Sequence, residues 1–388
     1  MRISGYISCI LCTVLLLLGN RTIAGTRTDH AIGVNIRPSY IIPTHGFYNG
    51  WNPFEKPLRF SYSAHAAYQF SYPDDTVKGR LFPGVYQGIG IGVQSFMAGD
   101  ILGNPISLYL FQGAPLFSLS ERITLDYEWN FGLSAGWIPN NSYVTASAFN
   151  VYINVGLLFN WRLDENWGLI FGPEYTHYSN GDTAFPNGGA NTVNLRIGAK
   201  RHFCTGNVTV PQAIIFKAEQ EQPRFWQNVT YDISLFGGFR ADRMLVGKTL
   251  HVINKAFPLI GVQFNPLYNF NRCLSVGPSL DLIYDNSANL TASADDNDIL
   301  NYSYPTFYRQ CAAGLSVRGE LKMPIFAVNI GIGNNFSFKG SDLRGIYGVF
   351  ALKAFLSDSL FLGVSYRLSS VLYSHNMMFG IGWRFNRN

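Results

Sequence analysis

The stretch "NWGLIFGPEYTHYS" (residues 166–179) sets the pattern from which the fold follows. Apolar or aromatic side chains stand at every second position from Trp167 to Tyr175. Consecutive side chains of a strand point to opposite faces, so this alternation predicts a strand with one apolar face. The stretch exceeds the ~5–6 residues usual for a strand in a globular sheet. It suits the ~9–11 residues of a tilted strand that crosses a bilayer, and so predicts a membrane-crossing strand.

The same alternation recurs along the chain, with turn residues between the repeats. In the first half, the candidate strands lie at residues 30–40, 58–72, 86–97, 105–117, 122–137, 148–163, 166–179 and 190–203. In the second half, they lie at residues 229–241, 257–270, 273–285, 305–321, 324–338, 344–356, 360–370 and 375–385. A more polar segment with two prolines separates the halves, and we expect this segment, residues 206–228, to be a connector.

The composition fits strands whose outer surface is not in water. Charged residues make up only 14% of the chain, against a usual ~25%, while aromatic residues reach 15%. No segment beyond the N-terminus has the ~18 consecutive apolar residues of a membrane-spanning helix. The formal charge of +5 comes without a dense run of Lys and Arg. This gives no electrostatic basis for nucleic-acid binding, so no nucleic-acid partner is expected.

The N-terminus has the features of an export signal. Arg2 precedes the apolar run "ISCILCTVLLLLG" (7–19), and "TIAG" (22–25) offers a small-residue cleavage site after Ala24. These features predict a signal peptide over residues 1–24. The remaining cysteines show no close pair and no metal-ligand spacing, so neither a disulfide framework nor a bound metal is expected.

Long antiparallel strands after an export signal predict an all-β, transmembrane β-barrel in the outer membrane of a Gram-negative cell. A closed barrel pairs every backbone group in lipid without leaving an edge. Two geometries remain open: two eight-stranded barrels in tandem, or one barrel of about sixteen strands. We expect residues 25–205 to form the first barrel domain and residues 229–388 a second half. A small barrel is filled by side chains, so a catalytic site would lie on its wall or rim.

The second half resembles a degenerate copy of the first. Residues 168–180 align with residues 359–371, and the alignment matches Gly172 to Gly363 and Tyr175 to Tyr366. In this register, Leu368 falls at the position of His177, and Ser370 falls at the position of Ser179. We therefore expect an internal duplication in which the second copy has lost its histidine.

His177 and Ser179 are two residues apart, so they share one face of their strand, ~6.5–7 Å apart by strand rise. A serine needs an adjacent base to become a nucleophile, and a histidine can serve at neutral pH. Such a pair also needs a group that orients the imidazole and N–H donors for an oxyanion. Two acids are near enough in sequence to be the orienting group. Glu174 points to the face of the strand opposite to His177, whereas Asp182 lies near the turn. Asparagines and glycines crowd the segment that follows.

The segment "HYSNGDTAFPNGGAN" (177–191) resembles the signature of PagL-type lipid A 3-O-deacylases, an H-x-S-N pattern followed by P-N-x-G. The matching residues are His177, Ser179, Asn180, Pro186, Asn187 and Gly189. The resemblance implies an eight-stranded barrel whose catalytic residues lie on the wall near the membrane interface. It also implies an esterase that removes the 3-linked acyl chain of lipid A, with no cofactor and no metal.

By this resemblance, Ser179 is the nucleophile, His177 is the general base, and Asn180 and Asn187 form or support the oxyanion hole. The family commonly has a Glu as the third member of the triad, at the position that Asn191 occupies here. An asparagine can orient an imidazole, although it cannot stabilise an imidazolium by charge. The partners implied are lipid A within lipopolysaccharide and the lipid of the outer membrane, with a homodimer left open.

Two other interpretations compete with the esterase. The chain could be a non-enzymatic barrel, with a structural, adhesive or pore role, that retains the motif as a relic. It could also be a secreted, soluble β-sandwich that binds glycans, because strands of such folds alternate as well.

Overall fold

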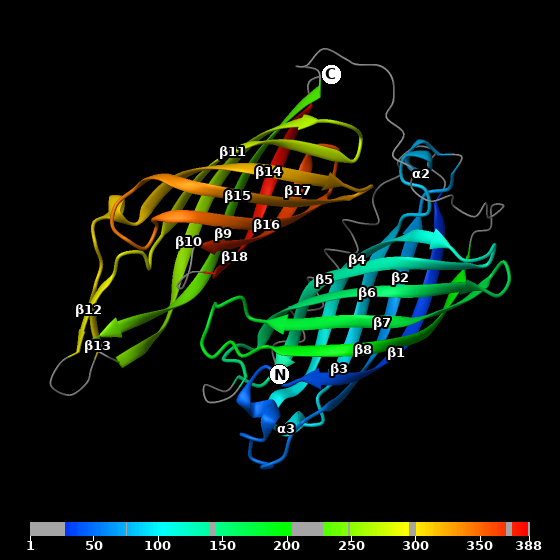
Figure 1. Cartoon of the computed structure of the whole chain (residues 1–388), viewed down its shortest axis with the longest axis horizontal. Coiled ribbons are helices and arrows are strands. Elements are labelled where there is room, and N and C mark those ends of the chain that lie inside the picture. Colours follow the sequence, from blue (N-terminus) through cyan, green and yellow to red (C-terminus); the bar gives the residue numbers. More distant parts are fainter. Residues whose placement is uncertain are drawn as a thin grey trace, which may run out of the picture.

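The computed structural model describes residues 28–74, 76–139, 144–203, 228–246, 249–294, 300–369 and 375–386. These residues form two closed antiparallel β-barrels of eight strands each (Figure 1). Of the two geometries left open by the sequence, the tandem arrangement is therefore the one observed, and the β-sandwich interpretation is wrong. The predicted signal peptide and nearly all of the predicted connector lie outside the described residues.

The first barrel is a simple meander in which each strand pairs with the next. Its strands are β1 (Asp29–Ile42), β2 (Phe60–Ser71), β3 (Tyr86–Ser95), β4 (Gly103–Ser118), β5 (Ile123–Trp137), β6 (Phe149–Arg162), β7 (Trp167–Ser179) and β8 (Ala190–His202). Pairing of β8 with β1 closes the barrel and removes both sheet edges. Three short helices lie in the connections: η1 (Gly46–Asn49), α2 (Val77–Leu81) and α3 (Gly99–Leu102).

The second barrel has the same meander, interrupted by one hairpin. Its strands are β9 (Val229–Val246), β10 (Thr249–Asn269), β11 (Leu274–Asp285), β14 (Cys311–Lys322), β15 (Phe326–Phe338), β16 (Gly345–Phe355), β17 (Leu360–Ser369) and β18 (His375–Asn386). Between β11 and β14, β12 (Thr291–Ala294) and β13 (Leu300–Ser303) form a separate two-stranded sheet, followed by η3 (Phe307–Arg309). The sequence pattern predicted neither β12 nor β13, and it placed the start of β10 at residue 257 rather than at Thr249.

The outer faces of both barrels carry large apolar side chains. In β7, Glu174 and Thr176 are buried and point into the barrel, whereas Tyr175, His177 and Ser179 alternate with them on the outer face. Exposed Val, Leu, Ile and aromatic side chains recur at outer positions of strand after strand. Such a surface suits contact with lipid rather than with water. Among the helices that the structure describes, none is long and apolar enough to cross a bilayer.

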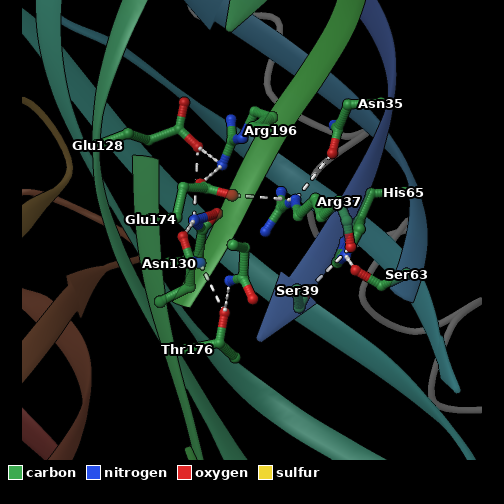
Figure 2. Close-up of polar contacts among 12 residues, drawn as sticks. Asn35, Arg37, Ser39, Ser63, His65, Glu128, Asn130, Glu174, Thr176 and Arg196 are labelled. Carbon is green, nitrogen blue, oxygen red and sulfur yellow. Dashed lines mark hydrogen bonds and ion pairs between the residues drawn. The ribbon is translucent and has the colours of Figure 1, made fainter. Parts of the chain in front are cut away.

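Charged side chains fill the interior of the first barrel (Figure 2). The carboxylate of Glu174 forms ion pairs with Arg37, at 3.2 Å, and with Arg196. Arg196 also contacts the Glu128 carboxylate at 2.8 Å, so two cations face two anions. A cavity of about 30 Å³ remains beside Arg37 and Lys200, which is room for one or two water molecules. Paired charges and neighbouring polar side chains thus occupy the interior around Glu174, as expected for a barrel of eight strands.

The second barrel uses a separate set of buried charges. Asp232 and Glu320 face Lys353 and Arg384, and each of the four contacts in this set measures 2.5 or 2.6 Å between nitrogen and oxygen. All four side chains are at most 7% exposed. Because buried charges are tolerated only when they are paired, this network compensates the loss of water inside the barrel.

The two ends of the barrels differ in the length of their connections. At one end of the first barrel lie the connections 43–59, 96–102, 138–148 and 180–189, which together have 45 residues, against 22 at the other end. At the other end, residues 119–122 and 163–166 make tight turns, next to the connection 72–85 that carries α2. In the second of these turns, Asp164 Oδ1 accepts the backbone N–H groups of Asn166 and Trp167, which lowers the pKa of the carboxyl. His177 and Ser179 lie at the end with the longer connections.

Candidate active site

His177 lies on β7 directly opposite Asn191 on β8. The distance between His177 Nδ1 and Asn191 Oδ1 is 2.7 Å. An amide oxygen can only accept a hydrogen bond, so Nδ1 carries the proton in this arrangement. The Nε2 atom of the neutral ring then has a free lone pair, which is the state that a general base requires.

Asn191 is held in place by two further hydrogen bonds. Its Oδ1 atom accepts a bond of 2.6 Å from the Tyr175 hydroxyl, and its Nδ2 atom donates one of 2.9 Å to Thr44 Oγ1. These partners fix the amide so that its oxygen, and not its nitrogen, faces His177. Thr44 lies 147 residues away in the chain, in the connection after β1. Sequence reasoning missed this residue, because only closure of the barrel brings β1 next to β8.

Two N–H donors converge on the hydroxyl of Ser179. The backbone N–H of Gly181 donates to Ser179 Oγ at 3.0 Å, and Asn187 Nδ2 donates at 3.2 Å. A backbone N–H and a side-chain amide are the kinds of donor that form oxyanion holes, and both lie next to the candidate nucleophile here. His177 and Ser179 share the outer face of β7, although no hydrogen bond joins their side chains. Catalytic hydrogen bonds are often long or poorly aligned before substrate binds.

The loop between β7 and β8 positions the Asn187 amide. The backbone N–H of Asn180 donates to Asn187 Oδ1 at 2.9 Å, which turns Asn187 Nδ2 towards Ser179. The side chain of Asn180 is buried, and its Nδ2 atom donates to the Ala184 carbonyl at 2.8 Å. The geometry thus places Asn187 at the serine and Asn180 behind it, where it supports the loop.

Neither of the nearby acids contacts His177. Glu174 lies inside the barrel with its two arginine partners, as strand parity predicts. The Asp182 carboxylate accepts a hydrogen bond of 2.9 Å from Asn187 Nδ2. The group that orients the imidazole in this structure is therefore the neutral amide of Asn191.

A second His–Ser pair lies inside the first barrel (Figure 2). His65 Nε2 is 2.9 Å from Ser63 Oγ, and His65 Nδ1 is 3.1 Å from the Tyr109 hydroxyl. Both residues of this pair are buried among the side chains that fill the barrel. A lipid substrate cannot reach them, so this pair is a structural polar contact and does not compete with the outer-face pair.

At the position of the second barrel that aligns with His177, the chain has Leu368. Leu368 stands on the outer face of β17, where it pairs with His375 of β18 and is 43% exposed. Leu368 therefore lies on the outer face of the seventh strand of its barrel, as His177 does in the first barrel. Ser370 lies outside the described residues. Within the described ranges of the chain, no group of three or more His, Cys, Asp or Glu side chains is placed to hold a metal ion.

Two closed barrels with apolar outer walls place this chain in the class of β-barrel membrane proteins. Residues 86–200 match the family model described as lipid A 3-O-deacylase (PagL), and residues 229–387 match the one described as acyloxyacyl hydrolase, C-terminal domain. Together these matches cover most of the chain, which belongs to the PagL family. Family membership supports a lipid A deacylase function and an ester hydrolase, and with the barrel fold it points to the outer membrane.

Other comparisons add no closer relationship. No curated protein matches the chain in sequence. Solved structures similar to it include the TodX monoaromatic hydrocarbon channel deltaS2 mutant (11% identity, 94% of this chain and 90% of that chain, TM-score 0.20). They also include the COG4313 outer membrane channel from Pseudomonas putida F1 (11%, 94% and 97%, TM-score 0.19). A third is the siderophore receptor PirA from Pseudomonas aeruginosa (8%, 93% and 81%, TM-score 0.23). At these TM-scores the similarities carry no conclusion about fold or function.

Proposed function

We propose that the protein is an outer-membrane serine esterase that removes the 3-O-linked acyl chain of lipid A. The observation that carries this proposal is the hydrogen bond from His177 to Asn191, because it leaves Nε2 free on the face that Ser179 shares. Residues 25–205 would form the catalytic domain after removal of a signal peptide at residues 1–24. Residues 206–228 would connect it to a degenerate second domain over residues 229–388.

The residues support a two-step acyl transfer. Ser179 Oγ attacks the ester carbonyl carbon, and its proton passes to His177 Nε2. The carbonyl oxygen becomes an oxyanion that accepts hydrogen bonds from Gly181 N–H and Asn187 Nδ2. Collapse of this intermediate breaks the bond to the sugar oxygen, which takes the proton from His177. A water molecule then attacks the acyl-serine carbonyl carbon and gives a proton to His177. As the bond from this carbon to Ser179 Oγ breaks, His177 returns the proton to Oγ, which releases the fatty acid and restores the serine hydroxyl.

The position of the site suits a lipid substrate. Outer-membrane barrels place their longer connections outside the cell and their short turns in the periplasm. In that orientation, the outer-face row Tyr175–His177–Ser179 lies at the level of the outer leaflet, where lipopolysaccharide resides. The ester can then approach from the side, and no acyl chain has to enter the filled barrel.

Mass spectrometry of lipid A tests this proposal directly. The chain is expressed in a Gram-negative host, and lipid A is compared with that of cells carrying an empty vector and of cells expressing Ser179→Ala. We expect loss of one 3-linked acyl chain with the parent protein alone. If lipid A stays intact while the parent protein is folded in the outer membrane, the proposed activity is wrong, and the non-enzymatic barrel becomes the better interpretation.

Asn191 offers a test of the mechanism, because it orients His177 without a charge. A carboxylate at this position would stabilise the imidazolium that forms as Ser179 attacks. We expect Asn191→Glu to raise kcat by about tenfold, and Asn191→Ala to lower it by about 10²-fold through loss of ring orientation. Rates of acyl release by the purified variants measure both effects. Equal rates for Asn191→Ala and the parent would remove Asn191 from the proposed triad.

A further inference from the structure

The second barrel touches the loop that carries the candidate oxyanion donor. Met377 of β18 lies against Gly181, such that a Cβ atom added to Gly181 would come within 2.8 Å of Met377 Cε. Met377 is on the outer face of its barrel, yet it is only 9% exposed. Phe379 and Ile381, on the same face of β18, are 45% and 48% exposed. Met377 is therefore covered by protein at a position where its neighbours face lipid.

A backbone hydrogen bond reinforces this contact. The N–H of Ala241 in β9 donates to the Asp182 carbonyl at 2.9 Å. Ala241 lies between Arg240, which pairs with Phe257 of β10, and Asp242, which pairs with Ile253. The register of β9 and β10 therefore shifts at Ala241. On the opposite edge of β9, the pairing with β18 reaches only as far as Gly237 and does not include Ala241. The Ala241 N–H is thus used between the barrels and not within the sheet.

The turn that these contacts hold has an unusual backbone conformation. Gly181 and Asp182 both adopt left-handed conformations, with φ values of 65° and 62°. Such conformations persist when the surroundings fix them, above all for a residue with a side chain. Because Gly181 N–H donates to Ser179 Oγ, a small rotation of this turn would swing the donor away from the serine.

The contact between the barrels extends well beyond this turn. Gln112 and Trp129 occupy outer-face positions of β4 and β5, and Trp129 Nε1 donates to Gln112 Oε1 at 2.6 Å. The Trp129 ring lies edge-on to Phe326 of the second barrel, with ring centroids 5.2 Å apart. Phe326 and Leu352 are also outer-face residues that are nearly fully buried. A glutamine on a wall facing hydrocarbon would be costly, so the sequence of this sector is suited to a protein neighbour.

We propose that the second barrel is a positioning element for the esterase site of the first. Met377 and the Ala241 backbone hold the Gly181–Asp182 turn, so that the Gly181 N–H stays directed at Ser179. This role rests on the proposed esterase function. It also gives the second barrel a purpose that needs no catalytic histidine of its own, in keeping with Leu368 at the matching position.

Kinetics of the purified full-length protein with lipid A in mixed micelles test the proposal. Loss of one oxyanion donor lowers kcat by ~10²–10³-fold. We expect partial displacement in Met377→Ala to lower kcat about tenfold, with KM within about twofold, because the donor acts mainly in the transition state. Met377→Leu, which keeps the volume, should restore the parent rate. Ile381→Ala, on the same face but exposed, is the matched control and should leave both constants unchanged.

A second variant covers the case in which Met377→Ala does not fold. Ala241→Pro removes the N–H that reaches Asp182 and takes no bond from the sheet, and it should lower kcat in the same way. Unheated samples on gels establish that each variant is folded. Full activity of folded Met377→Ala and Ala241→Pro beside an inactive Ser179→Ala would overturn the positioning role and leave the esterase proposal intact. Full activity of Ser179→Ala, or no deacylation by the parent, would overturn both.

Discussion

Ser179→Ala is expected to lower kcat for acyl release by about 10⁴- to 10⁶-fold, the range seen when a serine nucleophile is removed from a triad. Without the hydroxyl, no acyl-enzyme can form, and only the donors from Gly181 and Asn187 remain to assist attack by water. Substrate binding does not depend on Oγ, so KM should change little. Release of fatty acid from purified lipid A by the folded variant measures the effect, and a serine-reactive phosphonate should label the parent but not the variant.

The interior pair of the first barrel supplies the matched control for this experiment. Ser63→Ala removes a serine that actually contacts a histidine, since Ser63 Oγ lies 2.9 Å from His65 Nε2. This pair is buried inside the barrel, so its loss should leave kcat unchanged. The opposite result, with Ser63→Ala inactive and Ser179→Ala active, would place the chemistry inside the barrel and refute the outer-face site.

Glu174→Ala is expected to lower the free energy of unfolding of the first barrel by about 3–5 kcal/mol, the cost of breaking a buried ion pair by removing one partner. Glu174 forms ion pairs with both Arg37 and Arg196 while it is fully buried, and the alanine would leave Arg37 without this carboxylate. Glu174→Gln keeps a polar group in the same space, so its free energy of unfolding should lie between those of the parent and Glu174→Ala. Urea unfolding of the protein folded into lipid vesicles measures the difference.

Glu165→Ala is the matched control, because this carboxylate lies exposed in the turn between β6 and β7. Its loss should change the free energy of unfolding by no more than about 0.5 kcal/mol. If Glu174→Ala were as stable as Glu165→Ala, the arginines inside the barrel would have to be compensated by other groups, such as Glu128. Below their unfolding transitions, both variants should keep the parent kcat, because Glu174 faces away from Ser179.

Strand positions were predictable from the sequence because they depend on local alternation. The stretch at 166–179 became β7 at Trp167–Ser179, and the stretch at 190–203 became β8 at Ala190–His202. The choice between two barrels and one was not local. It depends on whether β8 pairs with β1 or with β9, and both options use the same hairpins up to that point. The hairpin of β12 and β13 was missed because each strand has only four residues.

The same distinction between local and non-local contacts applies to the candidate site. His177 and Asn191 flank one hairpin, so their pairing follows from the register of β7 and β8. Thr44 joins them only through barrel closure, and Met377 only through the contact between the barrels. Gly181 was one of several residues after the motif that could donate an N–H to an oxyanion, and only the backbone conformation of the turn shows that its N–H reaches Ser179. Residues that meet through local register were therefore predictable, and those that meet through closure or docking were not.

Under the proposed function, a reactive row on the outer wall of a barrel, and not in a pocket open to water, makes this protein a catalyst of two-dimensional chemistry. Its substrate arrives by lateral diffusion within a leaflet, and the sugar-bearing product leaves the same way. The quantity that governs its rate is then the mole fraction of acylated lipid at the membrane surface, not a bulk concentration. Neighbouring lipids compete for the same strip of wall, so the composition and packing of the membrane act directly on turnover.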